Sequence, residues 1–191
     1  SLTLTAPNGG QAWVVGTSQN ITWTKTGTLP NLKLEYSTNG GTTYPNLITA
    51  STRGGNLSYA WTIPDAIGIL LRVRVTYDTS PDTLDLSDAS DADFTIRGSI
   101  TVTAPNGSEG WAINSVQNIT WTKTGTLTGL LKLEYSTDGG TTYPVGNLIS
   151  ATVLASSTSY AWTIPDNPSA QSRVRVTQLD DTAVTDQSDA N

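Results

Sequence analysis

One stretch of eleven residues, QNITWTKTGTL, stands at positions 19–29 and again, letter for letter, at positions 117–127. Further blocks repeat around it in the same order: LKLEYST at 32–38 and 131–137, GGTTYP at 40–45 and 139–144, and SYAWTIPD at 58–65 and 159–166. The offset between the copies drifts from 98 to 101, so small insertions separate the blocks. The chain therefore contains two copies of one unit.

The boundary between the copies lies near Arg97-Gly98-Ser99, where the second copy of the opening segment begins. A chain of 191 residues is long enough for two domains of ordinary size. We therefore predict one domain over residues 1–97 and a second over residues 98–191. Each is large enough to bury a hydrophobic core of its own.

Within each copy, apolar and polar residues alternate over short runs. Ile21 and Trp23 alternate with threonines, Val73 and Val75 alternate with arginines, and Asn39-Gly40-Gly41 is a hairpin signal. About seven short strands with a turn signal every 8–12 residues are typical of a sandwich. The sequence predicts an all-β protein of two tandem immunoglobulin-like (fibronectin III-like) β-sandwich domains.

The apolar phase of these runs also predicts the core. In the first copy the core residues are expected to be Trp13, Ile21, Trp23, Leu34, Tyr36, Trp61, Val73, Val75, Phe94 and Ile96. The remaining tryptophans, Trp111, Trp121 and Trp162, repeat the first three. Because tryptophan supplies a large buried area, all six are expected to pack in the cores.

An ordered series of motifs runs through the first copy: Pro7-Asn8-Gly9-Gly10, Trp13, Asn20-Ile21-Thr22-Trp23, Glu35-Tyr36-Ser37-Thr38, Gly40-Gly41, Trp61-Thr62-Ile63-Pro64 and Arg72-Val73-Arg74-Val75. This series resembles the Ser-Thr-rich, GPI-anchored fungal cell-wall family and its relatives in large secreted bacterial proteins. The resemblance covers both copies almost end to end. It implies extracellular spacers or wall components without an assigned active site.

The composition excludes most catalytic chemistry. The chain has no His and no Cys, which excludes Ser-His and Cys-His nucleophile pairs, thiolate zinc sites and disulfides. Its only glutamates are Glu35, Glu109 and Glu134, and their positions do not suggest a carboxylate pair for glycoside hydrolysis. We therefore expect neither an enzyme nor a cofactor.

The net charge and the Ser-Thr-rich composition indicate which kinds of partner the chain is expected to have. A net charge of −6 argues against nucleic acid and against anionic membrane surfaces. No apolar run approaches the roughly 20 residues of a membrane span, so no membrane insertion is expected. Ser and Thr make up more than a quarter of the chain, a composition common in extracellular wall and appendage proteins. The chain is therefore expected to be a mature, secreted protein.

Aspartates gather late in the first copy, and Asp82, Asp85 and Asp88 are candidate ligands for Ca²⁺. Calcium takes 6–8 oxygen ligands, and the spacing fits no EF-hand-type pattern. The favoured interpretation is therefore a solvated acidic loop that keeps an edge strand from pairing with another chain, and no metal site is expected.

Two charge pairs are expected on the outer surface of the sandwiches. Glu35 alternates outward and is expected to pair with Arg74, and Glu134 repeats it with Arg175. We predict that both pairs face solvent, where such a pair contributes about 0–1 kcal/mol.

The second copy stops early. Ser188-Asp189-Ala190-Asn191 aligns with Ser90-Asp91-Ala92-Asp93, after which the first copy continues with Phe94-Thr95-Ile96. We therefore expect the second domain to lack its final strand. Either the sequence is cut short at this point, or a neighbouring subunit supplies the strand. The candidate assembly residues are Leu2, Leu4, Ser188, Asp189, Ala190 and Asn191.

These observations favour a non-catalytic extracellular structural protein, a segment or subunit of a surface fibre or cell-wall assembly. Its partner would be a second copy, joined head to tail by a heterologous contact. The alternative is a carbohydrate-binding or adhesive module of a larger secreted protein, with cell-wall polysaccharide as partner. Tyr44 and Tyr143, expected to be exposed after the Gly-Gly turns, would be its contact points unless they pack on their own loops.

Overall fold

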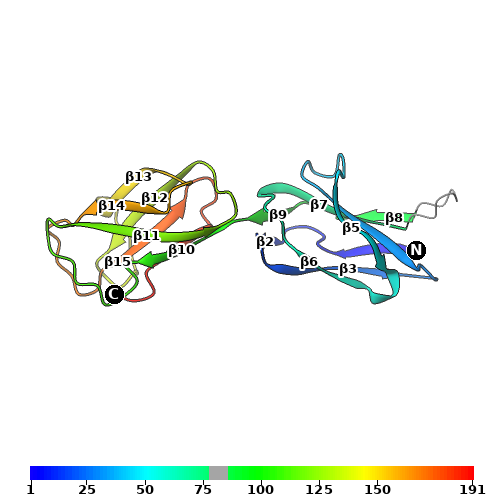
Figure 1. Ribbon diagram of the computed structural model, residues 1–191, viewed down its shortest axis with the longest axis horizontal. Helices are drawn as coiled ribbons and strands as arrows, with labels where there is room; N and C mark the ends of the chain where they lie inside the picture. The colour runs from blue at the N-terminus through cyan, green and yellow to red at the C-terminus, as the bar shows by residue number, and fades with distance from the viewer. Residues whose placement is uncertain (78–85) are drawn as a thin grey trace. The chain divides into compact units, whose positions relative to one another are not determined.

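The computed structural model describes residues 1–77 and 86–191. Its internal contacts divide the chain into two compact units, Ser1–Arg97 and Gly98–Asn191, which we call domain 1 and domain 2. These bounds coincide with the boundary between the two sequence copies. In Figure 1 the strands of domain 1 run from blue to green and those of domain 2 from green to red.

Domain 1 is built from two sheets. The first has the strand order β1-β3-β6 and consists of β1 (Leu2–Ala6), β3 (Ser18–Lys25) and β6 (Ser58–Thr62). The second has the order β2-β9-β7-β4-β5, with β8 also paired to β7. Its strands are β2 (Ala12–Val14), β4 (Asn31–Ser37), β5 (Asn46–Arg53), β7 (Gly68–Tyr77), β8 (Leu86–Ala89) and β9 (Phe94–Arg97).

Domain 2 repeats this arrangement with fewer strands. One sheet has the order β10-β11-β14 and the other the order β13-β12-β15-β16. The strands are β10 (Ser99–Ala104), β11 (Val116–Thr124), β12 (Leu130–Ser136), β13 (Leu148–Leu154), β14 (Ser159–Thr163), β15 (Arg173–Gln178) and β16 (Thr185–Gln187). Short 3-10 turns, η1 (Gly54–Asn56) and η2 (Val145–Asn147), lie one in each domain. No helix within the described residues is long and apolar enough to cross a membrane.

In each domain the two sheets enclose one hydrophobic cluster, so the predicted fold, two tandem immunoglobulin-like β-sandwiches, is confirmed. The described residues form nine strands in domain 1 and seven in domain 2. The expectation of about seven strands per copy is therefore wrong for domain 1. Leu86–Ala89, within the acidic stretch, is an edge strand paired to β7 and not part of a solvated loop.

Strand alternation selects the core. On β3, Ile21 and Trp23 point inward and are 0% and 2% exposed, while the threonines between them lie on the other face. All ten predicted core residues belong to the domain 1 cluster, Tyr36 as a partly buried member. In domain 2, Trp121 is as buried as Trp23. Trp111 and Trp162 are partly buried members of the domain 2 cluster, so they pack in the core, but less completely than Trp13 and Trp61 do in domain 1.

A clasp of hydrogen bonds closes domain 1 between the loop after β1 and the loop after β8. The Ser90 hydroxyl donates to the carbonyl oxygen of Pro7 at 2.7 Å. The Asn8 amide donates to the Asp91 carboxylate at 2.7 Å and accepts from the Asp91 N–H at 2.8 Å. These contacts explain why the Pro-Asn-Gly and Ser-Asp-Ala motifs recur together in both copies.

The Gly-Gly hairpins are held by the side chains that precede them. In domain 2 the Ser136 hydroxyl accepts from the Asp138 N–H at 3.1 Å and from the Gly140 N–H at 2.9 Å. The Asp138 carboxylate accepts from the Thr142 N–H at 2.9 Å and from its hydroxyl at 2.6 Å. Domain 1 has Asn39 in place of this aspartate.

The Asp138 hairpin is expected to weaken in acid. Hydrogen bonds from the hydroxyls of Ser136 and Thr142 lower the pKa of Asp138 from 3.8 to about 2. A depressed folded pKa means that this carboxylate stabilises the hairpin above about pH 4, and that the contribution is lost as the pH falls through about 2. A carboxyl NMR titration should give a midpoint near pH 2 for Asp138. A midpoint near 4 would contradict the assignment, and Asp138→Asn, which copies domain 1, is the control without a titrating group.

Candidate functional site

The main difference between the two domains lies where β9 runs in domain 1. β9 is parallel to β2, with Trp13 paired to Ile96, and antiparallel to β7, with Leu71 paired to Phe94. Two flanking hydrogen bonds extend this pairing. The Thr95 N–H donates to Gln11 O at 2.8 Å, and the Val15 N–H donates to Arg97 O at 3.0 Å. β9 therefore closes the sheet between β2 and β7.

The side chains of β9 also close the aromatic core of domain 1. Phe94 and Ile96 are 1% and 0% exposed. The Phe94 ring lies 5.0 Å from Trp13 and 6.5 Å from Trp61, measured between ring centroids. Those two tryptophans stand edge to face at 6.0 Å. Phe94 is therefore the ring that covers the Trp pair.

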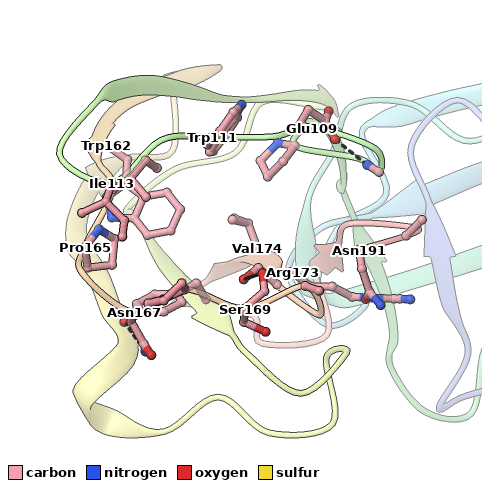
Figure 2. Close-up of a pocket in the computed structure, with 18 residues that line it drawn as sticks. Glu109, Trp111, Ile113, Trp162, Pro165, Asn167, Ser169, Arg173, Val174 and Asn191 are labelled. Carbon is pink, nitrogen blue, oxygen red and sulfur yellow. Dashed lines mark hydrogen bonds between the residues drawn. The ribbon is translucent and has the colours of Figure 1, made fainter.

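No strand of the described part of domain 2 is equivalent to β9, and a cavity of about 270 Å³ opens in its place. Figure 2 shows Trp111 on one side of this cavity and Ser169 and Arg173 on the other, with Trp162 at one end and Asn191 at the opposite end. We call this cavity the β9 groove. It lies wholly within domain 2.

The groove keeps the aromatic walls that β9 covers in domain 1. Trp111 and Trp162 stand edge to face at 6.2 Å, and Tyr135 lies 5.2 Å from Trp162. The equivalent distances in domain 1 are 6.0 and 5.3 Å. At the rim, Ile113 is 41% exposed, whereas its counterpart Val15 is 9% exposed. The groove is thus a preformed concave apolar surface.

Both backbone edges of the groove differ from those of domain 1. Neither edge is formed by a strand. One edge is residues 111–113, which are equivalent to β2, and the other is residues 169–172, which are equivalent to the first four residues of β7. Within the described residues, the carbonyl of Glu109 and the N–H of Ile113, which match the groups that bond β9, make no hydrogen bond. The edge formed by residues 109–113 is therefore open to an additional strand.

Ala170 and Ser172 also line this groove, and neither was among the predicted site residues. Domain 1 has the apolar segment Ile69-Leu70-Leu71, and domain 2 has Ala170-Gln171-Ser172 at the equivalent positions. The available signal was this local loss of apolar residues just before the repeated block that starts at Arg173. The aromatic pattern alone could not reveal it, because the tryptophans are identical in both copies.

Residues 188–191 lie at one end of the groove. The Ser188 hydroxyl donates to Pro105 O at 2.7 Å, and Asp189 exchanges hydrogen bonds with Asn106, as their counterparts do in the domain 1 clasp. Asn191 Oδ1 accepts from Arg173 Nε at 2.8 Å. Ala190 and Asn191 line the groove. Ser188 and Asp189 therefore close the domain itself, and only the last two residues of this candidate set face the groove.

The other two assembly candidates lie in the core of domain 1. Leu2 and Leu4 are 5% and 1% exposed on β1, which pairs with β3. The Asp88 carboxylate also accepts from the Leu4 N–H at 2.7 Å. These two leucines therefore stay predictions as assembly contacts, and they become accessible only when β1 leaves its sheet.

The same hydrogen bond bears on the calcium hypothesis. Asp82 and Asp85 lie outside the described residues, and Asp88 is engaged by Leu4. In the described part of the chain, no group of three or more acidic side chains is arranged to hold a metal ion. The calcium alternative at Asp82 and Asp85 is therefore untested, while Asp88 has a structural partner.

The outer charge pairs form as predicted, but they are not fully exposed. In domain 2, Glu134 lies opposite Arg175 and 2.8 Å from it, and Lys132 lies 3.0 Å away on the other carboxylate oxygen. Burial alone would raise the pKa of Glu134, but the hydrogen bonds and charges of Arg175 and Lys132 outweigh burial and hold the pKa below its usual value. The Tyr143 ring covers Arg175, with 3.8 Å between the guanidinium carbon and the ring centroid.

Domain 1 repeats this cluster with Glu35 and Arg74 at 2.8 Å, and with Tyr44 over Arg74 at 4.5 Å. The glutamate of domain 2 is 6% exposed. The prediction that both pairs simply face solvent is therefore wrong, because a tyrosine from the hairpin covers each arginine. Tyr44 and Tyr143 are accordingly half-buried rather than exposed.

Comparisons with known proteins add little to this geometry. No protein-family model and no curated protein matches the chain, so the resemblance to fungal cell-wall modules stays an expectation. Among solved structures, the chain is similar to the fibronectin(III)-like modules of Clostridium thermocellum CbhA. The identity is 18% and the TM-score 0.34, over 98% of this chain and 91% of that one.

Two further structures are similar to the chain. One contains the N-terminal four Ig domains of Dscam1 isoform 6.9, at 10% identity and a TM-score of 0.39, over 97% of this chain and 44% of that one. The other contains the chicken CNTN1 FN1-FN3 domains, at 10% identity and a TM-score of 0.27, over 92% of this chain and 56% of that one. The chain thus spans about half of each. With such scores, strand order and register carry the fold assignment.

Proposed function

We propose that the chain is a non-catalytic structural segment of an extracellular, cell-surface assembly. In this proposal the tandem sandwiches act as rigid spacers, and domain 2 is joined to a neighbouring copy by a strand that enters the β9 groove. The observation that carries the proposal is the groove, which combines two backbone groups without hydrogen-bond partners among the described residues, Glu109 O and Ile113 N–H, with a half-buried Trp pair. An exposed sheet edge with apolar pockets beside it is the usual acceptor in strand addition.

The geometry of such a contact favours a chain of subunits over a closed dimer. Domain 1 fills its own slot with Phe94 and Ile96, so in this proposal domain 2 is the acceptor. A contact in which one surface of a subunit accepts a different surface of its neighbour is heterologous and joins the subunits head to tail. In a homopolymer the donor would be β1, displaced from β3 because Leu2 and Leu4 are buried there, or a segment outside the given sequence.

The composition is consistent with this role. A chain without His and Cys lacks the commonest catalytic and metal-binding side chains. A surface rich in Ser and Thr with a net charge of −6 suits an extracellular protein with no affinity for nucleic acid. Secretion and surface location are therefore part of the proposal.

One observation favours a second function, that of a carbohydrate-binding or adhesive module. The half-buried Trp111 and Trp162 stand in the same groove as the polar side chains of Glu109, Asn167 and Arg173. Aromatic faces beside hydrogen-bonding groups are typical of sites for amphipathic ligands such as sugars. Cell-wall polysaccharide would then be the partner.

The proposal is tested by extending the chain. Appending Phe-Thr-Ile-Arg-Gly after Asn191, the residues that follow Asp93 in domain 1, should fill the groove from within the same molecule. The matched control appends Ser-Thr-Ser-Arg-Gly, which has the same length and charge without the apolar residues. Light scattering and negative-stain microscopy should show filaments for the parent and the control, and monomers for the Phe-Thr-Ile extension.

The other results would contradict the proposal. Parent chains that stay monomeric at every concentration would exclude self-assembly through the groove. Filaments that form equally well with the Phe-Thr-Ile extension would show that the groove is incidental. If the parent binds soluble wall polysaccharide and Trp111→Ala abolishes that binding, the second function replaces the first.

A further inference from the structure

We propose that Asn20 and Asn118 are sites of N-linked glycosylation, so that each domain carries one oligosaccharide on the outer face of its three-stranded sheet. The proposal rests on secretion, which is part of the proposed function, and depends neither on self-assembly nor on the β9 groove. It starts from the sequence, in which Asn20-Ile21-Thr22 and Asn118-Ile119-Thr120 are Asn-x-Thr acceptor triplets.

The fold places both acceptor side chains in solvent. On β3 the triplet is extended, and Ile21 points into the core, where it is 0% exposed. The period of two therefore turns Asn20 to the outer face, and it is exposed there. Asn118 has the same position on β11, next to the equally buried Ile119. Neither carboxamide makes a hydrogen bond within the described residues.

Small neighbours leave room for a sugar on these amides. Across the strand pair, Asn20 lies opposite Ala60 on β6, and the pairing of β1 with β3 ends at Thr22, before it reaches Asn20. Domain 2 repeats both features, with Ala161 opposite Asn118. A substituent on either amide therefore lies over a methyl group and extends into solvent.

The outer face around each acceptor is uncharged. In domain 1 its outward residues are all Thr, Ser, Asn or Ala: Thr3, Thr5, Ser18, Asn20, Thr22, Thr24, Ser58, Ala60 and Thr62. Domain 2 repeats this set, except that Val116 replaces Ser18.

Such a face departs from an ordinary soluble surface, of which about 25–35% is charged. The ion pairs of Glu35 with Lys33 and Arg74 lie on the other sheet of domain 1. An oligosaccharide is bulky and solubilising, so on the neutral face it takes the place of charge. It also shields the edge strands β1 and β6 from pairing with another chain.

The two remaining acceptor triplets lack this combination. Asn106-Gly107-Ser108 lies in the domain 2 clasp, where the Asn106 amide donates to the Asp189 carboxylate at 2.8 Å. Asn56-Leu57-Ser58 is exposed, but domain 2 has Ser157-Thr158-Ser159 in its place. Neither triplet belongs to the proposal, and both serve as comparisons within the same chain.

The transfer is a substitution at a sugar carbon. The carboxamide nitrogen of Asn20 attacks C1 of an oligosaccharide that is linked to a lipid diphosphate. A C–N bond forms, the C1–O bond to the diphosphate breaks, and one amide proton passes to solvent. The Thr22 hydroxyl belongs to the acceptor motif, and in the folded sheet it is hydrogen-bonded to the Thr5 hydroxyl at 2.7 Å. Attachment therefore precedes the pairing of β1 with β3.

Mass spectrometry of protein taken from the surface of the cells that make it tests the proposal. Trypsin releases Asn20 in residues 1–25 and Asn118 in residues 98–123. Both peptides are expected to be heavier by whole sugar residues, with fragment ions that place the sugar on these asparagines. Chains with sugar at neither asparagine, or at only one of the two, would overturn the proposal.

Variants secreted by the same cells separate a sugar on the amide from a sugar on a hydroxyl. Thr22→Ala is expected to remove the sugar from Asn20 and to leave that of Asn118, which reports on secretion of the same molecule. Thr22→Ser should retain both sugars, because serine keeps the acceptor motif. Thr24→Ala, on the same face but outside the triplet, is the matched control and should also retain both. A sugar that persists on residues 1–25 of Thr22→Ala would overturn the proposal.

These outcomes are separable from those of the proposed function. Protein that reaches the cell surface without sugar refutes the glycosylation and leaves the structural role. Protein confined to the cytoplasm refutes the secretion on which both depend. Sugars at both sites on chains that stay monomeric support the glycosylation and refute self-assembly.

Discussion

Replacing Trp23 with alanine is expected to lower the free energy of unfolding of domain 1 by about 3–5 kcal/mol. The indole is 2% exposed at the centre of the cluster between the two sheets, and its N–H donates to the carbonyl oxygen of Gly54 at 3.0 Å. Truncation would leave a large cavity together with an unpaired buried carbonyl. Urea denaturation followed by fluorescence measures the loss.

Trp121 provides a matched control for the hydrogen bond. It is also 2% exposed, but its indole N–H has no partner among the described residues. Trp121→Ala should therefore cost about as much as Trp23→Ala in packing. Trp23→Phe should cost about 1–3 kcal/mol more than Trp121→Phe, because only the first leaves a buried acceptor unsatisfied. Equal losses for the two phenylalanine variants would contradict the role of Gly54.

Phe94→Ala is expected to cost domain 1 about 3–5 kcal/mol and to open in it a counterpart of the β9 groove. The ring is 1% exposed and lies 5.0 Å from Trp13. Its removal should uncover Trp13 and Trp61 and shift their fluorescence to longer wavelength. Denaturation should show domain 1 destabilised and domain 2 unchanged.

Thr95→Ala is the control for this variant, because the threonine is only half-buried on the other face of β9. It should change stability by less than about 0.5 kcal/mol. A loss of under about 1 kcal/mol for Phe94→Ala would mean that the ring adds little to the Trp pair. An aromatic side chain on an added strand would then contribute little to binding in the groove of domain 2.

Much of the fold follows from local pattern. The period of two along Ile21 and Trp23, and along Val73 and Val75, marks strands whose alternate residues are buried. The exact repeats require that both copies fold alike, which places the boundary near Gly98. The alternation of apolar and polar residues did not predict β2, β5 and β8. β2 and β8 are short, and β5 has no fully buried residue.

The groove could be predicted only in part. The alignment of Asn191 with Asp93 indicates that residues 98–191 include no counterpart of β9, and this comparison needs only the local sequence. Whether Trp111 is buried depends on a partner that lies, in domain 1, about eighty residues away from Trp13 in the sequence. The tyrosines over Arg74 and Arg175 were misjudged for a similar reason, because cation–π stacking joins a hairpin to a strand that follows much later.

The identity of β3 and β11 has a consequence for how the chain folds. Both strands contain the same seven residues, QNITWTK, and their partners β6 and β14 have the same sequence, SYAWT. Local pairing energies therefore cannot tell the correct partner from its twin, and crossed pairing between repeats is a known failure of tandem domains. Synthesis from the N-terminus removes the ambiguity if β9 completes domain 1 before β14 leaves the ribosome. We therefore expect refolding from denaturant to yield more misassembled chain than synthesis does.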